Sequence, residues 1–223
     1  MKILSAVLLI LSFTSGAQAA VLQSYASGAA TPDPLGGYTM TDFGVTGIGG
    51  TTSSITSPIS GTLSFVNRYG SATSMLRTTA DSTSWWKNGE ATDNDIFLTG
   101  LSLVTILLPE NTRAFSFNVG ADLSSTGNNA WLSAIESTGS GSGVAKTWFN
   151  VNRTNTPGFG IYADNSNGGC SSLTSVTIDP VFWGFGNFSI NQDSCAKSVP
   201  EASSIYLLAI GLLGLLIVAR RKV

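Results

Sequence analysis

The feature that most limits the fold is a series of short segments in which apolar and polar residues alternate. Alternation is clear in Thr62–Val66 and again in Arg113–Val119, and it is typical of strands that are buried on one side. Turns rich in glycine and asparagine separate these segments, and the sequence between the two chain ends contains no convincing amphipathic helix pattern. The pattern predicts an all-β fold, a single antiparallel β-sandwich or jelly roll.

The second half of the chain continues this pattern. Trp148, Val151, Phe159 and Ile161 continue the strand pattern, and so does the segment Leu173–Ile178. Phe185–Ile190 is the last predicted strand. Ile96–Leu108 is long and apolar enough for a helix, but its β-branched residues and Gly100 favour two joined strands. The polar stretches Thr51–Ser57 and Ser137–Gly143 are predicted to be low-complexity loops.

Composition excludes several functions. The chain has 223 residues, of which 11% are charged, a formal net charge of −2 and no histidine. This length fits one domain, and the negative charge disfavours nucleic acid as a partner. Without histidine there is no Ser-His-Asp triad and no histidine-bound zinc. Only carboxylates remain for catalysis, and no Glu-x-Asp-x-x-Glu strand motif is present. We therefore expect no enzyme, with a carboxylate-based glycoside hydrolase as the less favoured alternative.

The N-terminus has the features of an export signal. Met1 and Lys2 precede an apolar segment, Ile3–Phe13, and Ala17-Gln18-Ala19 follows it. A basic start, a short apolar core and a small-residue exit predict a secretory signal peptide over 1–19. The alternatives are a membrane anchor or a buried helix, but the apolar segment is too short to span a bilayer. The predicted ectodomain then covers residues 20–198.

The C-terminus combines three features in a fixed order. These are the segment Val199, Pro200, Glu201 and Ala202, a predicted transmembrane helix over 203–219 that is apolar from Ile205 on apart from Tyr206, and the basic residues Arg220, Arg221 and Lys222 within 220–223. As a helix, Ala202–Ala219 would be roughly 27 Å long, just enough to cross the hydrocarbon core. The basic residues predict that this end stays in the cytoplasm and that the ectodomain lies on the other side of the membrane.

This tail, residues 199–223, resembles the PEP-CTERM sorting signal of Gram-negative bacteria. Ala202 stands where the family most often has a second proline. The resemblance implies export by the secretion machinery, a precursor anchored in the inner membrane, and cleavage by an exosortase near Pro200-Glu201. It also implies a final location at the cell surface or outside the cell. The alternative is a plain single-pass anchor in which the proline stops the helix.

The segment Arg113–Ile190 resembles the jelly-roll, lectin-like ectodomains that often precede PEP-CTERM tails. The similar residues are Ala114–Gly120, Pro157–Ile161, Ser175–Ile178 and Gly186–Ser189. The resemblance implies a fold and leaves the ligand open.

The two cysteines, Cys170 and Cys195, both lie in the predicted ectodomain. An even number of cysteines in an exported chain predicts a disulfide, here closing a loop of roughly 25 residues. Two free thiols are the alternative. The bond would tie the last predicted strands together just before the tail.

A cluster of acidic residues is a candidate calcium site. Glu90, Asp93 and Asp95 place carboxylate oxygens close together in the sequence, and Ca²⁺ prefers oxygen ligands. Their spacing does not match an EF-hand loop, so a solvated acidic turn is the favoured alternative. We expect no other cofactor.

Two tryptophans are candidates for stacking on sugars. Trp85 and Trp86 are adjacent, and adjacent residues on a strand point to opposite faces, so one of them is expected in the core, and core packing is favoured over sugar stacking. The sequence therefore predicts an exported, non-catalytic surface or extracellular-matrix protein associated with exopolysaccharide or biofilm. A carbohydrate-binding, lectin-like module is the alternative.

Overall fold

The computed structural model describes residues 20–26, 29, 32–44, 49–79, 85–86, 95–100, 103–122, 129–138, 141–164, 170–179 and 183–194. Within these ranges every regular element is a β-strand and every strand pair is antiparallel. The all-β prediction is therefore confirmed. The predicted signal peptide, 1–19, and the predicted sorting tail, 199–223, lie outside the described residues. Among the residues described, no helix has the length and apolar character needed to cross a membrane.

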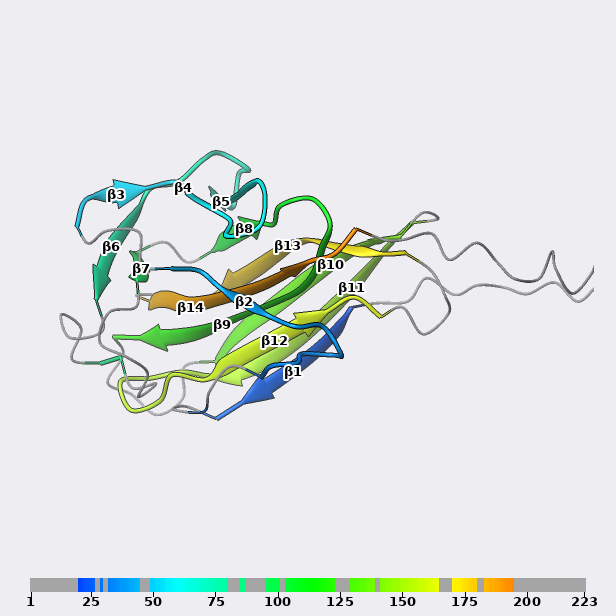
Figure 1. The fold of residues 1–223 in the computed structure, drawn as a ribbon. Helices are drawn as coiled ribbons and strands as arrows, with labels where there is room; N and C mark the ends of the chain where they lie inside the picture. The colour runs from blue at the N-terminus through cyan, green and yellow to red at the C-terminus, as the bar shows by residue number, and fades with distance from the viewer. Residues whose placement is uncertain are drawn as a thin grey trace, which may run out of the picture.

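The strands form two sheets (Figure 1). The eight-stranded sheet has the order β1 (Val21–Tyr25), β12 (Gly158–Tyr162), β9 (Thr112–Ala121), β14 (Trp183–Gln192), β7 (Asp95–Thr99), β6 (Met75–Thr79) and β3 (Thr51–Thr52), and β2 (Thr41–Asp42) also pairs with β14. The six-stranded sheet has the order β11 (Gly141–Asn150), β10 (Asn129–Thr138), β13 (Ser172–Asp179), β8 (Val104–Leu107), β5 (Thr62–Asn67) and β4 (Ser54–Thr56).

The core lies between the two sheets. Alternate residues of each strand point into it, so that Phe115, Phe117 and Val119 of β9 share one buried cluster with Leu132 of β10 and Ile178 of β13. Aromatic rings fill its centre: the centroids of Phe65 and Phe185 are 5.3 Å apart. Aromatic pairs at such distances add about 0.5–1.5 kcal/mol each beyond the burial of their area. The result is a β-sandwich with one core.

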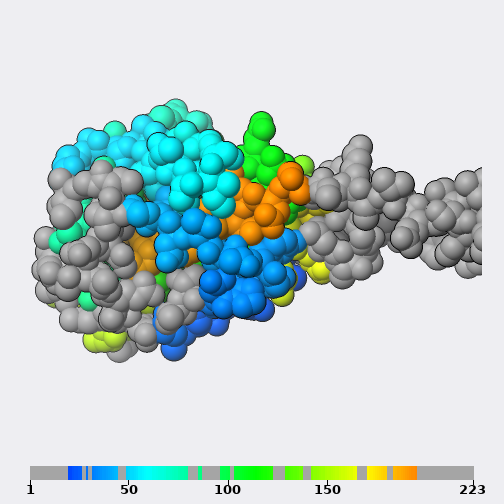
Figure 2. All heavy atoms as spheres, viewed as in Figure 1, coloured from blue at the N-terminus to red at the C-terminus, as the bar shows by residue number. Residues whose placement is uncertain are grey.

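The outer face of the eight-stranded sheet is covered by other parts of the chain, and we call it the covered face. All ten residues of β9 are buried, including those that point away from the core. Residues 32–44 form part of the cover and lie over β14 in Figure 2, where they are blue against orange. The side chain of Asn191 in β14 donates a 2.9 Å hydrogen bond to the carbonyl of Thr39, and Ser189 Oγ donates to Asp42 Oδ1.

Glycines in β9, β12 and β14 let the cover approach the sheet closely. Gly120 of β9 pairs with Gly184 of β14, and a Cβ on Gly120 would lie 2.8 Å from an indole carbon of Trp85. A Cβ on Gly160 of β12 would lie 2.6 Å from Leu35, a buried residue of the cover. The absence of side chains at these positions is what makes room for a third layer.

The sequence-based strand predictions were right for most of the described residues, and two of the predicted loops were wrong. Ile96–Leu108 forms two strands, as predicted, although β7 and β8 belong to different sheets. The predicted loop Thr51–Ser57 contains β3 and β4, and Ser137–Gly143 contains the ends of β10 and β11. Backbone pairing with neighbouring strands stabilises these polar segments. Such pairing cannot be recognised from the apolar content of the segment itself.

Candidate ligand-binding face

Many of the predicted site residues lie outside the described residues. They are Val199, Pro200, Glu201, Ala202, Arg220, Arg221, Lys222, Cys195, Glu90 and Asp93. The structure therefore does not test the sorting motif or the basic tail. It does place Trp85, Trp86, Asp95 and Cys170, which are considered in turn.

Trp85 and Trp86 belong to the covered face. Trp86 is 7% exposed and Trp85 is partly buried. Their rings meet edge to face, with centroids 6.2 Å apart, and both contact the space above Gly120. The two side chains lie against the same glycine because the pair sits between strands and not within one. Their geometry is that of packing residues, the interpretation favoured above for this pair.

Asp95 is the first residue of β7 and pairs with Thr79 of β6. Its expected partners in a calcium site lie outside the described residues. In the part of the chain that the structure describes, no three acidic, histidine or cysteine side chains are grouped so that they could hold a metal ion. The calcium site stays a prediction.

Cys170 lies two residues before the start of β13 and contacts a buried arginine. Arg113 Nη2 donates to Cys170 Sγ at 3.0 Å, and Arg113 Nε donates to the carbonyl of Asp193 at 2.9 Å. No free cysteine is found among the described residues. Because Cys195 is not one of these residues, its pairing with Cys170 stays a prediction.

Arg113 also marks one end of the space between the sheets. It lies on the core side of β9, and Glu136 lies on the core side of β10, where its side chain has no exposed surface. Burial raises the pKa of Glu136. A hydrogen bond from Ser171 and the positive charge of Arg113 oppose this effect. Burial likewise raises the pKa of Tyr38 at the same end of the sandwich.

The outer face of the six-stranded sheet carries exposed aromatic side chains near its β10–β11 edge. Trp131 of β10 lies directly opposite Trp148 of β11. Trp148 is 65% exposed, and Trp131 is partly exposed. Lys146, two residues before Trp148, places its Nζ 4.2 Å from the ring centroid of Trp131 and 4.9 Å from that of Trp148. We call Trp131, Lys146 and Trp148 the tryptophan face.

Polar side chains adjoin the tryptophan face. Asp179 of β13 is the register partner of Trp131, on the side away from Trp148. In the next row, Thr177 and Ser133 are paired, and Thr177 is also paired with Thr105 of β8. The hydroxyls of Thr105 and Thr177 are 2.8 Å apart. Two indole rings are thus flanked by an ammonium group, a carboxylate and several hydroxyls.

Sequence reasoning missed this face because its two tryptophans are 17 positions apart in the chain. The β10–β11 hairpin brings them together, since Thr138 pairs with Gly141 and the register continues unbroken to Trp131 and Trp148. A signal was present: Trp131 interrupts the apolar set Ala130, Leu132 and Ala134 and therefore points away from the core.

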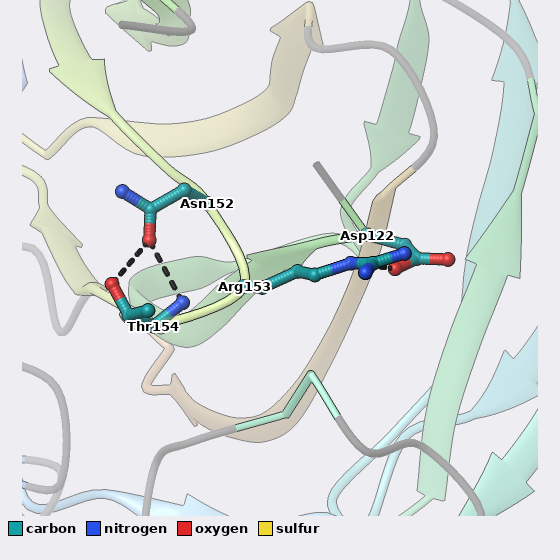
Figure 3. Close-up of polar contacts among 4 residues, drawn as sticks. All are labelled: Asp122, Asn152, Arg153 and Thr154. Carbon is teal, nitrogen blue, oxygen red and sulfur yellow. Dashed lines mark hydrogen bonds and ion pairs between the residues drawn. The ribbon is translucent and has the colours of Figure 1, made fainter. Parts of the chain in front are cut away.

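The turn after β11 is stabilised by hydrogen bonds between Asn152 and Thr154 (Figure 3). The Oδ1 atom of Asn152 accepts hydrogen bonds from the backbone N–H of Thr154 at 2.8 Å and from its hydroxyl at 2.6 Å. Arg153, between them, pairs with Asp122 at the end of β9 with an Nε–Oδ1 distance of 2.6 Å. Both partners of this ion pair are about half exposed, so it contributes little to stability.

The fold and this face define an all-β module with an open aromatic surface. No known protein-family profile matches the chain, and no curated protein matches it. A solved structure with some likeness is that of TmCBM61 in complex with β-1,4-galactotriose, with 9% sequence identity and a TM-score of 0.31. The match covers 59% of this chain and 88% of the other.

Proposed function

We propose that this chain is an exported, non-catalytic surface protein whose β-sandwich binds carbohydrate through the tryptophan face. The observation that carries the proposal is the exposure of Trp148 beside Trp131 on a sheet face that the described residues leave open. Contiguous exposed apolar patches rimmed by polar residues mark ligand-binding or interaction surfaces in soluble proteins, and Trp131 and Trp148 form such a patch.

The chemistry of the tryptophan face suits sugars. A pyranose ring presents C–H groups on its faces and hydroxyls on its edge, so an indole can stack on the first while polar groups bind the second. Lys146 supplies donors and Asp179 supplies acceptors on either side of Trp131. Their opposite charges offset one another locally, which favours hydroxyl groups over a strongly charged ligand.

Binding is tested with the full-length chain, purified in mild detergent and applied to an array of polysaccharides that includes exopolysaccharide. We expect retention on at least one glycan and about a tenfold loss of affinity in Trp148→Ala, since one stacked aromatic contact is removed. The matched control is Leu76→Ala, an exposed apolar residue of the other sheet, which should bind as the parent does. No retention on any glycan would overturn the carbohydrate-binding role.

Export and sorting are supported by the sequence alone. The signal peptide over 1–19 and the tail over 199–223 imply a precursor in the inner membrane that an exosortase processes and passes to the surface or matrix. The intact mass of the native protein should place its C-terminus near Pro200-Glu201. A mass that includes Val223 would instead indicate an ordinary membrane anchor.

A further inference from the structure

A second exposed apolar pair lies on the β10–β11 hairpin. Ile135 of β10 is directly opposite Val144 of β11, and the two side chains are 36% and 59% exposed. Ala134 and Glu136, the neighbours of Ile135 in the chain, are both buried on the core side. Because successive residues of a strand point to opposite faces, Ile135 and its register partner point outward. We call Ile135 and Val144 the aliphatic pair.

Register places the aliphatic pair on the same outer face as the tryptophan face. Each tryptophan of that face is four positions from the aliphatic residue of its own strand, and residues an even number apart on a strand share a face. The register of β10 with β11 is unbroken between the two pairs, and Ser133 lies opposite Lys146 midway (Figure 1). At about 3.4 Å per residue, the two pairs are roughly 14 Å apart along the strands. We call the six residues of these three register pairs the hairpin strip.

The hairpin strip is apolar at both ends and polar in the middle. The Lys146 ammonium group and the Ser133 hydroxyl provide hydrogen-bonding groups between the two apolar pairs. A ligand with both C–H surfaces and hydroxyls can pack on the two ends and bind the polar groups between them. A flat apolar partner would instead bury the ammonium group without an acceptor, which is costly. The strip therefore suits a chain of sugar rings.

The exposed apolar residues favour a ligand along the hairpin over a ligand across the sheet. Leu107 of β8 is also exposed on this face, but Ser175 of β13 lies in register between it and Ile135. The Ser175 side chain is small and buried, so it interrupts the apolar surface in that direction. Along the hairpin, exposed apolar side chains from both strands are met at each end of the strip.

We propose that the tryptophan face and the aliphatic pair form one extended site, which binds a segment of a linear polysaccharide lying along the β10–β11 hairpin. This inference rests on the proposed carbohydrate binding and adds the length and direction of the ligand. A distance of roughly 14 Å is covered by several linked sugar rings, whereas a single ring stacked on Trp148 ends well before Val144. The site therefore recognises a chain and not a single sugar.

The test measures how affinity depends on ligand length and on the residue substituted. Cello-, xylo-, manno- and galacto-oligosaccharides of two to six units are titrated calorimetrically into the full-length chain in mild detergent. The variants are Trp148→Ala, Val144→Ser, Val144→Ile and Leu107→Ser. We expect affinity to rise with length and then level off, and Trp148→Ala to weaken binding at every length.

The decisive variant is Val144→Ser. It should lower affinity about fivefold for six units and leave two units unchanged, because the short ligand is held at the tryptophan face and only the longer one reaches Val144. Val144→Ile keeps the apolar surface and should bind as the parent does. Leu107→Ser is the matched control, an exposed aliphatic residue of the same face outside the strip, and it should bind as the parent does at every length.

The outcomes separate this inference from the proposed function. Binding that is equally tight for two and six units, or that Val144→Ser does not change, would overturn the extended site and leave the tryptophan face as a small sugar site. A loss in Leu107→Ser as large as that in Val144→Ser would overturn the direction of the ligand. Weaker binding of two units in Val144→Ser would show that the substitution alters the tryptophan face itself, and the extended site would be rejected. Failure of every oligosaccharide to bind would overturn both proposals.

Discussion

The outer faces of the two sheets differ in what covers them and in which residues they present. The covered face of the eight-stranded sheet presents Gly120, Gly184 and Ser189 to other parts of the chain, and all three are buried. The outer face of the six-stranded sheet presents Trp148 and Lys146 to solvent. In this protein the smallest residues lie under a third layer, and some of the largest apolar residues lie exposed.

This inversion shows where stability and binding are located. Because the outer face of the eight-stranded sheet has glycines below them, Trp85, Trp86 and Leu35 pack closely on the sheet. This packing removes apolar surface from water and stabilises the fold. Trp148 makes no such contribution, because most of its surface remains in water. An aromatic residue that the fold does not need is available to a ligand.

The strongest way to break the comparison is to remove one tryptophan from each face. Trp86→Ala should lower the free energy of unfolding by about 3 kcal/mol, because a buried indole is lost and a cavity is left. Trp148→Ala should change it by no more than about 0.5 kcal/mol, as is usual for exposed positions. Urea denaturation of both variants, followed by tryptophan fluorescence and circular dichroism, measures the difference. Equal losses would show that the two faces are equivalent, and the assignment of roles would fail.

A smaller change in stability is expected from a charge on the core side of the six-stranded sheet. Glu136 is buried there, whereas Lys146 lies on the outer side of the same sheet. Burial raises the pKa of Glu136, so the folded protein binds this proton more tightly than the unfolded chain does. The stabilisation from this group is complete below the unfolded pKa and is lost as pH rises through the folded pKa. Glu136→Gln should therefore be more stable than the parent at neutral pH, by less than the loss in Trp86→Ala.

The check is a series of urea unfolding curves from acid to neutral pH for the parent and Glu136→Gln. The difference in unfolding free energy between them should shrink toward acid pH, where Glu136 is protonated in both states of the parent. A constant difference across this range would mean that the carboxyl does not titrate differently on folding. A variant less stable than the parent at neutral pH would show that the interaction with Arg113 outweighs the burial of charge.

The sequence predicted the fold class because alternation depends on which side of a strand is buried. Arg113–Val119 and Leu173–Ile178 show this pattern, and they form parts of β9 and β13. It gave less warning of β10 and β11, because glycine, serine and alanine fill much of the hairpin. Such residues have low β-propensity, and pairing with β13 decides their conformation.

The candidate site could not be predicted in the same way, because it depends on register between strands. Nothing local in the sequence joins Trp131 to Trp148. Trp85 and Trp86 are adjacent in the sequence, but both lie against Gly120 because the pair sits between strands. The tryptophan face becomes visible only when the β10–β11 pairing is known.

The position of β14 has a mechanical consequence. It is the last strand before the predicted tail, and it is hydrogen-bonded to β9 along one side and to β7 and β2 along the other. Tension on the chain beyond Asp193 would act along this strand and load its hydrogen bonds in shear, many at a time. An edge strand pulled from its end would instead open bond by bond. If the chain is tethered through its C-terminus, as the proposed sorting requires, a pull on the tether would act on a strand that is hydrogen-bonded along both sides.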